Sequence, residues 1–219
     1  MSLKKIYNRL YQYHGPQAWW PGDSPFEIMV GAVLTQNTAW LNVERAINNL
    51  IEADALSAEA IIAAHPKRLA GWLRPSGYFN VKAKRLKNYC HWYVQQGAYP
   101  ALSAWSTVDL RAGLLSVNGV GPETADDILL YAFERPVFVI DAYTRRLFKR
   151  LGLIEGDEPY EELRRFFEKG LKTATARIPL FNEYHALIVM HAKHFCKTRP
   201  DCAGCCLATQ CEAVLAGIA

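Results

Sequence analysis

Residues 114–125 read LLSVNGVGPETA, and this stretch decides the predicted fold. It lies between two segments in which apolar residues recur with the period of a helix. Gly119 and Gly121 permit a tight turn and a close approach of the backbone, and Pro122 suits the first turn of a helix that we expect to run to about Phe133. The free N–H groups at that helix start could bind a phosphate, or the glycines could serve only the turn, and the spacing supports the two interpretations equally.

The composition around this stretch is that of a globular protein. The chain has 219 residues, of which 51% are hydrophobic, so it can build a substantial core and is not disordered as a whole. Its 25 basic and 21 acidic residues give a net charge of +4, which permits a nucleic-acid partner without requiring one. The apolar runs are too short to cross a bilayer and no secretory signal is evident, so we expect a cytoplasmic protein with no membrane partner.

Helical periodicity dominates the rest of the chain. Ser24, Pro25 and Glu27 have the spacing of a capping box with proline at the first helical position, which predicts a helix start. The only strongly strand-like run is VFVI at residues 137–140, and it has no obvious pairing partner. We therefore predict an all-α protein with many short helices joined by short loops. Its apolar stripes are formed by Leu3, Ile6, Tyr7, Leu10 and Tyr11; by Leu163, Phe166, Phe167 and Leu171; and by Tyr184, Leu187, Ile188 and His191.

Five of the six cysteines lie in the C-terminal tail, and in a reducing compartment such a group indicates a metal site rather than disulfides. Four of them have the spacing C-x5-C-x2-C-x5-C. A single C-x2-C flanked by single cysteines suits a [4Fe–4S] cluster better than zinc, whose sites usually pair two knuckles across a longer spacer. Cys206 could replace Cys205 as a ligand, and a group of buried free thiols is the alternative to a metal site. The four candidate ligands are Cys196, Cys202, Cys205 and Cys211.

Three segments, taken in chain order, resemble those of one protein family. Residues 117–125 resemble the helix-hairpin-helix of the endonuclease III superfamily of DNA glycosylases, and VFVIDAYTRR at residues 137–146 resembles its catalytic-aspartate stretch. The cysteine tail resembles its iron–sulfur loop, with a first gap one residue shorter. The resemblance implies two all-α lobes. One is a six-helix barrel lobe over residues 25–136 with the hairpin at about 109–133, and the other joins residues 1–24 to 137–219 and carries the cysteine loop at 196–211.

The resemblance also implies a reaction. Asp141 would stabilise the cationic sugar that forms when an N-glycosidic bond breaks and would help to orient or deprotonate water. Taken alone, Asp141 is the expected N-cap of the helix that follows it, and the two roles are compatible. In members with lyase activity a lysine early in the second hairpin helix attacks the sugar. Glu123 stands at that position here, so we expect a monofunctional glycosylase that leaves the DNA backbone intact.

The aromatic residues narrow the expected substrate. WWP at residues 19–21, IMVGAVLTQNTAW at 28–40 and RPSGYFNVKAKR at 74–85 resemble the bacterial 3-methyladenine DNA glycosylase branch. This resemblance implies a pocket for a flipped base. A 3- or 7-methylated purine is cationic, and electron-rich rings attract it by stacking and cation–π contact. The alternative is that some of these rings belong to the core. The implied pocket residues are Trp19, Trp20, Pro21 and Trp40.

The resemblance places further residues on double-stranded DNA that contains a damaged base. Gln36 would fill the gap left by the flipped nucleotide, and Tyr78 would wedge beside the orphan base; otherwise they are a polar helix end and a core aromatic. Basic residues cluster between 82 and 87, between 145 and 150 and between 193 and 199, and these clusters predict contacts to the phosphate backbone. We expect a monomer. The remaining expected DNA contacts are Gly119, Gly121, Thr124 and Arg145, and the first basic cluster comprises Lys82, Lys84, Arg85 and Lys87.

Three other functions compete with an alkylpurine glycosylase. The first is an endonuclease III-like glycosylase and lyase acting on oxidised pyrimidines, which the glutamate at position 123 disfavours. The second is a non-catalytic DNA-binding iron–sulfur protein, which Asp141 disfavours. The third is an iron–sulfur electron carrier that does not touch DNA.

Overall fold

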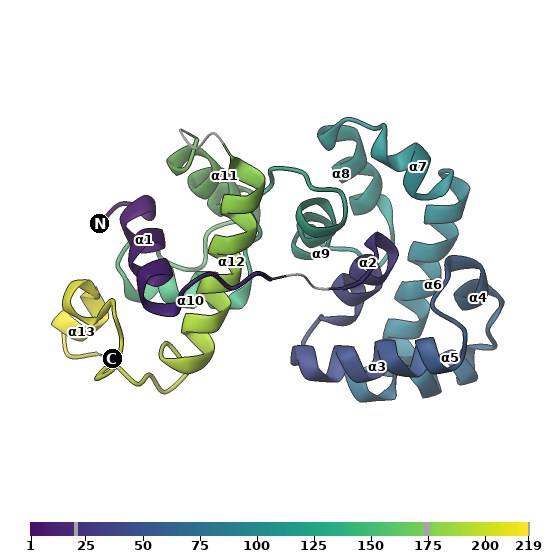
Figure 1. Cartoon of the computed structure of the whole chain (residues 1–219), viewed down its shortest axis with the longest axis horizontal. Coiled ribbons are helices and arrows are strands. Elements are labelled where there is room, and N and C mark those ends of the chain that lie inside the picture. Colours follow the sequence, from purple (N-terminus) through teal and green to yellow (C-terminus); the bar gives the residue numbers. More distant parts are fainter. Residues whose placement is uncertain (20–21, 173–175, 219) are drawn as a thin grey trace. The chain divides into compact units, whose positions relative to one another are not determined.

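The chain is all-α, as the sequence predicts (Figure 1). The computed structural model describes residues 1–19, 22–172 and 176–218, and these contain no strand. The chain divides into two compact units, one made of Met1–Trp19 and Pro136–Ala219 and the other of Trp20–Arg135. We call them unit 1 and unit 2. The elements are α1 (Leu3–His14), α2 (Pro25–Leu34), α3 (Trp40–Glu52), α4 (Ala58–Ala63), α5 (Pro66–Trp72), η1 (Arg74–Ser76), α6 (Phe79–Gln95), α7 (Ala98–Ser103), α8 (Thr107–Ser116), α9 (Pro122–Asp127), η2 (Ile128–Ala132), α10 (Ala142–Arg150), α11 (Tyr160–Gly170), α12 (Arg177–His194), η3 (Ala208–Gln210) and α13 (Glu212–Leu215).

Helix α2 forms the centre of unit 2. Residues 28–34 are all buried, and α2 packs against α3, α6, α9 and η2. A helix that is apolar on every face is stable in water only when neighbours enclose it. The predicted capping box is present in part, since the Ser24 hydroxyl accepts a hydrogen bond from the Glu27 amide (3.2 Å), while the Glu27 carboxylate accepts one from the Asp23 amide (3.3 Å). The cap fixes the start of α2, and Gln36 lies two residues beyond the other end of this helix.

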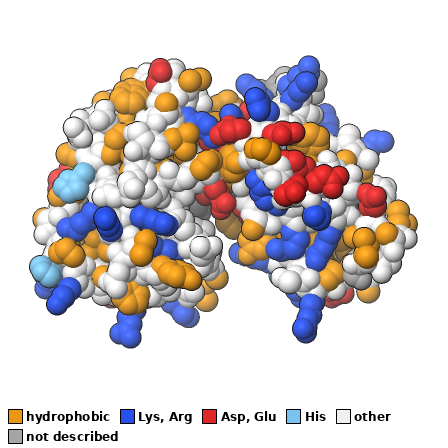
Figure 2. Space-filling view, turned by 180° about the vertical axis from the view of Figure 1, so that it is seen from behind, with side chains coloured by type: hydrophobic (Ala, Val, Ile, Leu, Met, Phe, Trp, Pro, Cys, Tyr) orange, Lys and Arg blue, Asp and Glu red, His pale blue; other side chains and the backbone are white. Residues whose placement is uncertain are grey.

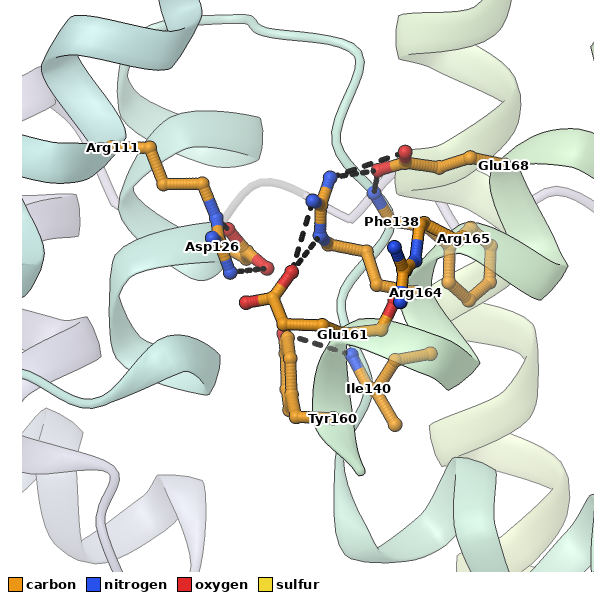
Figure 3. A network of polar contacts seen from close by, with 9 residues as sticks. All are labelled: Arg111, Asp126, Phe138, Ile140, Tyr160, Glu161, Arg164, Arg165 and Glu168. Carbon is orange, nitrogen blue, oxygen red and sulfur yellow. Dashed lines mark hydrogen bonds and ion pairs between the residues drawn. The ribbon is translucent and has the colours of Figure 1, made fainter. Parts of the chain in front are cut away.

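The predicted hairpin joins α8 to α9. Gly119 has a φ of +102°, a backbone conformation that an L side chain rarely adopts, and a Cβ there would meet the side chain of Arg85. Gly121 has ordinary extended backbone with open space around its Cα. A buried ion pair ties the two helices together, because Arg111 of α8 contacts both carboxylate oxygens of Asp126 on α9 at 2.7 and 3.2 Å (Figure 3). Helix α9 continues without a break into η2, a π-helical turn that ends at Ala132.

Unit 1 is built around α12, which contacts both α1 and α10. The Tyr184 hydroxyl of α12 donates a hydrogen bond to the Leu3 carbonyl at the start of α1, at 2.8 Å. Stacked and edge-on rings fill the core between the helices, which adds directional contacts to the apolar burial. These buried rings are Phe138, Phe148, Phe167, Phe181 and Tyr184.

The strand-like run at 137–140 is extended and buried but pairs with no strand in the described chain. Side chains of α11 take the place of a partner strand. The carboxylate of Glu168 accepts from the Phe138 amide (3.1 Å), and the hydroxyl of Tyr160 accepts from the Ile140 amide (3.3 Å; Figure 3). These bonds satisfy backbone groups that would otherwise be buried without partners. They also fix the segment that delivers Asp141.

Across the described residues we find no helix that combines the length and the apolar character needed to span a bilayer.

Candidate active site

Asp141 is the N-cap of α10, as the sequence predicts. Its backbone is extended and its Oδ1 accepts a hydrogen bond of 2.7 Å from the Thr144 amide. The residue is buried, and its side chain keeps 12% of its surface exposed. The buried run 137–140 leads into it on one side and α10 holds it on the other. The carboxylate is therefore fixed by backbone on both sides, with a small accessible face.

His185 of α12 completes the surroundings of this carboxylate. Its Nε2 lies 3.5 Å from Asp141 Oδ2, on the opposite oxygen from the Thr144 amide. Burial raises the pKa of the Asp141 carboxyl. The hydrogen bond and charge of His185, together with the Thr144 amide, outweigh that effect and bring the pKa below its ordinary value of 3.8. At neutral pH the group is an anion, which is the form that can stabilise a developing cation.

Glu123 lies in the first turn of α9, where an acidic side chain interacts favourably with the helix dipole. No lysine occurs between residues 121 and 134, so neither α9 nor η2 carries an amine that could form a Schiff base. The position at which lyase members are expected to hold their nucleophile is thus occupied by a carboxylate.

The described tryptophans of the expected base pocket belong to different units. Trp19 is half-buried in unit 1, and the ammonium of Lys193 lies 5.9 Å from the centre of its ring. Trp40 opens α3 in unit 2 and packs on Gly31 of α2, where a Cβ would come within 3.0 Å of the indole. Trp20 and Pro21 lie outside the described residues. Neither described ring is a fully buried core residue.

Gln36 is held by the hairpin. Its amide nitrogen donates to the Gly119 carbonyl (3.1 Å) and to the Thr124 hydroxyl (3.0 Å), and its amide oxygen accepts from Arg85. Thr124 is itself buried, so its hydroxyl serves Gln36 rather than solvent. Gln36 is therefore more than a polar helix end, because the contacts fix its side chain against the hairpin turn.

Tyr78 is not a core aromatic. Its side chain is 71% exposed, and its φ of +45° is left-handed, which is rare for a bulky residue. Gly77 before it also has a positive φ, of +68°. For a residue other than glycine such backbone costs about 1–3 kcal/mol, so at Tyr78 it persists only because neighbouring structure enforces it. The strain at Tyr78 is a reason to look for a function there.

The first basic cluster, residues 82–87, is only partly a surface feature. Lys84 is exposed and Arg85 is half-buried against Gln36, but Lys82 is fully buried. Lys87 is half-buried and donates to the carbonyls of Ile62 and Ala64 at 2.7 and 2.6 Å, where it closes the end of α4. The prediction that all of these cations face phosphates is wrong for Lys82, and the ammonium of Lys87 is also occupied by backbone carbonyls instead of being presented to DNA.

Arg145 also has protein partners. Its guanidinium donates to the carbonyls of Gly156 and Glu158, in the loop after α10, at 3.3 and 2.9 Å. On the face drawn in Figure 2, Lys and Arg side chains stand in several separate groups, and Asp and Glu side chains gather on one part of the surface. That acidic part is unsuited to a phosphate backbone.

The four predicted ligand cysteines line one small cavity in unit 1. Cys206 is not among the residues that line it, whereas Cys205 is. The remaining wall includes the apolar side chains of Leu147, Leu151, Leu207 and Val214. Among the described side chains, no three His, Cys, Asp or Glu residues converge tightly enough for a single metal ion.

Helix α10 and α12 both reach this cysteine loop. Arg150 of α10 donates to Cys196 Sγ (3.3 Å) and to the Lys197 carbonyl (2.6 Å), and Arg146 donates to the Cys196 carbonyl (2.7 Å). From α12, His191 Nε2 lies 3.3 Å from Cys205 Sγ. Burial, with the charges of His14 and His194 after it, lowers the pKa of His191 to about 4. The loop is thus bound to the helix that Asp141 caps.

A helix-hairpin-helix in one helical unit and a buried, helix-capping carboxylate in the other define a class, that of the helix-hairpin-helix DNA repair glycosylases. Comparison with known proteins agrees. The sequence profile of the HhH-GPD superfamily of base excision DNA repair proteins matches residues 30–173. The chain belongs to this superfamily.

Individual relatives extend the match over nearly the whole chain. The protein is 48% identical over 206 residues to the "Putative DNA repair glycosylase MJ1434" of Methanocaldococcus jannaschii, covering 93% of this chain and 92% of that one. The crystal structure of 3-methyladenine DNA glycosylase from H. pylori, bound to 1,N6-ethenoadenine, is 32% identical with a TM-score of 0.78, covering 88% and 98%. A non-covalent endonuclease III–DNA complex superposes with a TM-score of 0.83 at 20% identity, covering 99% and 96%, which is a likeness of fold. The chain is a base excision repair DNA glycosylase, and DNA is its substrate.

His185 is the residue of this site that sequence reasoning missed. It lies between two residues of a recognised apolar stripe, Tyr184 and Leu187, and nothing in the local pattern distinguishes it from a core residue. Only the packing of α12 against α10 brings it to Asp141.

Proposed function

We propose that the protein is a monofunctional glycosylase that removes an alkylated purine, such as 3-methyladenine, from double-stranded DNA. The observation that carries the proposal is the ionised, nearly buried carboxylate of Asp141 in a chain that has no lysine in α9 or η2. One anion can stabilise a sugar cation, and without an amine only water can capture it.

The chemistry needs little more than this carboxylate. The bond between the base nitrogen and the sugar breaks, and its electron pair leaves with the base. A 3- or 7-methylated purine carries a positive charge, so it departs neutral and needs no strong acid to protonate it. Asp141 stabilises the positive charge that develops on the sugar, in a site where little solvent screens it. Water adds to the sugar with help from the same carboxylate, and its proton passes to the carboxylate or to solvent.

The pocket argument supports a cationic base. The ring of Trp19 already interacts with a cation, the ammonium of Lys193. A cationic purine could take the place of this ammonium or stack on the other face of the ring. The other residues that the resemblance implies for this pocket are Trp20, Pro21 and Trp40. The 32% identical H. pylori enzyme acts on 3-methyladenine by its name, and its crystal structure holds a modified adenine.

The cysteine cavity and the C-x5-C-x2-C-x5-C spacing support a [4Fe–4S] cluster held by Cys196, Cys202, Cys205 and Cys211, with zinc as the alternative. Bound there, a cluster would supply a rigid cross-link between four points of a short loop. The loop in turn binds α10 through Arg146 and Arg150. We assign it a structural and DNA-positioning role.

The test is base release from a panel of duplexes containing alkylated purines, oxidised pyrimidines, uracil and mismatched adenine. Each product is divided and analysed with and without hot alkali. The proposal predicts free alkylated base and strand breaks that appear only after alkali. Strand breaks without alkali, or release confined to another lesion class, would contradict it.

An endonuclease III-like lyase is the second candidate, because the fold superposes closely on endonuclease III. Borohydride added during reaction with an abasic duplex traps a Schiff base as a covalent adduct. We expect no adduct, and an adduct would establish the second candidate in place of the first.

A further inference from the structure

The starting observation is a charged group buried in unit 2 that the proposed mechanism does not use. Lys82 of α6 is 1% exposed, and its ammonium donates hydrogen bonds to the carbonyls of Leu34 (2.8 Å) and Ser76 (2.6 Å). Burial, with the charge of Arg85 after it, lowers the pKa of Lys82 to about 8. Most molecules still carry the charge at neutral pH. A buried ammonium costs free energy unless its hydrogen bonds compensate for it.

The two carbonyls stand at equivalent places in the chain. Leu34 is the last residue of α2 and lies two residues before Gln36. Ser76 is the last residue of η1 and lies two residues before Tyr78. The ammonium therefore joins the end of α2 to the end of η1. Each of these ends is followed, two residues later, by a side chain that is expected to enter DNA.

To enter DNA in a defined position, each of these two side chains needs a backbone that is held in place. The backbone at Gly77 and Tyr78 is left-handed. Among the described contacts, no hydrogen bond from the Tyr78 hydroxyl holds this exposed side chain in place. Gln36 is fixed on its other side by Arg85 and by the hairpin. Extrusion of a nucleotide costs a few kcal/mol, and inserted side chains offset that cost only when they are held in place before DNA arrives.

We propose that Lys82 is a positioning residue that sets the spacing of Gln36 and Tyr78 for holding a nucleotide out of the duplex. The inference rests on the proposed function. It goes beyond it by assigning the DNA-distorting step to a buried ammonium that never touches DNA.

The chain provides a matched control. Lys87 lies one and a half turns further along the same helix and also donates to two carbonyls, those of Ile62 and Ala64, but these belong to the end of α4. Lys82→Met and Lys87→Met both keep the apolar stem and remove the ammonium. Each leaves two carbonyls without that donor, and the thermal midpoints of both variants are measured so that a general loss of stability, which we expect to be larger at the fully buried Lys82, can be separated from an effect on DNA.

The first measurement does not depend on knowing the lesion. The probe is a duplex with 2-aminopurine opposite a tetrahydrofuran abasic site, and the readout is the rise in fluorescence when the orphan base is unstacked. We expect Lys82→Met to reduce this rise by about fivefold or more, while Lys87→Met and the wild type agree within about twofold. Single-turnover base release should fall by about tenfold or more in Lys82→Met alone, which corresponds to about 1.4 kcal/mol.

A double-mutant cycle separates positioning from a purely structural effect. If Lys82 acts through Tyr78, Lys82→Met should cost much less in a Tyr78→Ala background than in the wild type. Equal fluorescence in the two lysine variants, or additive effects in the cycle, would overturn the inference. Should Lys82→Met fail to fold, Lys82→Arg keeps the charge with a different reach, and a wild-type signal from it would also overturn the inference. Failure of the wild type to release any base would instead refute the proposed function.

Discussion

The carboxylate of Asp141 has two tasks that require the same ionisation state. As an N-cap it accepts a hydrogen bond from the Thr144 amide, and as a stabiliser of a sugar cation it must be negative. His185 favours the anion from the other side. The helix start and the proposed reaction are thus supported by one charge.

Asp141→Asn should therefore separate the two tasks. Asparagine caps a helix nearly as well as aspartate, so α10 should survive and the circular dichroism spectrum should be unchanged. Without the negative charge, single-turnover base release should fall by about 100-fold or more. Release at the wild-type rate would show that another group carries the reaction.

His185→Leu should change the pH dependence of the rate. With His185 removed, its hydrogen bond and charge no longer lower the pKa of Asp141, so that pKa should rise and the acid limb of the single-turnover profile should move to higher pH. His194→Leu, on an exposed residue of the same helix, is the control. Identical acid limbs in the two variants would mean that His185 does not support the anion.

The stability of the folded protein should also depend on the ionisation of Asp141, and the direction of its pKa shift fixes the direction of this pH dependence. The folded-state pKa of Asp141 is lowered, so its contribution to stability is present above the unfolded pKa of about 4 and is lost as the pH falls through the folded value. In His185→Leu that contribution should shrink, and the thermal midpoint of the variant should decline at a higher pH than that of the wild type.

For single residues, the sequence predicts a residue's place in a helix better than it predicts which side chains from elsewhere in the chain surround that residue. The cap role of Asp141 follows from its place before a helical pattern, and the structure confirms it. His185 could not be paired with it, because their contact depends on the packing of helices far apart in the chain. The exposure and left-handed backbone of Tyr78 are equally inaccessible from sequence, since both depend on how the neighbouring segments pack.

Among the elements, the helices of the hairpin are held together by a buried charge pair. Asp126 has a fully buried side chain, and Arg111 opposes it from α8 at 2.7 Å. Such a pair adds little over an apolar pair, but breaking one half of it is costly because the other charge stays buried.

Asp126→Leu should destabilise the protein by about 3 kcal/mol, because it leaves Arg111 buried without this partner. A drop in the thermal midpoint of roughly 5–10 °C is the expected size for a chain of this length. The double variant Arg111→Met with Asp126→Leu should recover part of the loss. If the double variant is no more stable than Asp126→Leu, the pair is not the source of the effect.

The cysteine loop permits a test between adjacent residues. Cys205 lines the cavity and Cys206 does not, so Cys205→Ser should lower the iron and sulfide content per protein while Cys206→Ser leaves both at the wild-type level. The measurement is chemical iron and sulfide analysis after anaerobic purification. If only Cys206→Ser lost iron, Cys206 would be the ligand and Cys205 would not.

The types of the elements could largely be predicted from the sequence, but the contacts that hold these elements in place could not. The helix starts at Ser24, Pro122 and Asp141 follow from caps and proline positions. The run at 137–140 looks like a strand because its backbone is extended and buried, yet side chains of α11 satisfy it. The spacing of the cysteines left Cys205 and Cys206 open, and only their three-dimensional placement distinguishes them.

For the whole molecule, charge predicts how DNA affinity should depend on salt. The net charge is +4, and the acidic side chains gather on part of one face, so phosphate contacts must come from the remaining surface. We expect at least three such contacts, which would lower the affinity for undamaged duplex by roughly 40-fold or more between about 50 and 200 mM salt. Fluorescence anisotropy over that range measures the slope. A flat response would argue against a phosphate-binding surface.

The way the chain is divided has a consequence for its synthesis. Unit 2 is one continuous run, Trp20–Arg135, whereas unit 1 needs both Met1–Trp19 and Pro136–Ala219. A ribosome therefore produces α1 first, and the apolar face of α1 has to wait until α12 has been translated before Tyr184 can bind it. Unit 2 can close its core in the meantime. Helix α1 is translated well before the helix that packs on it, which makes it the natural place for a chaperone to hold the nascent protein.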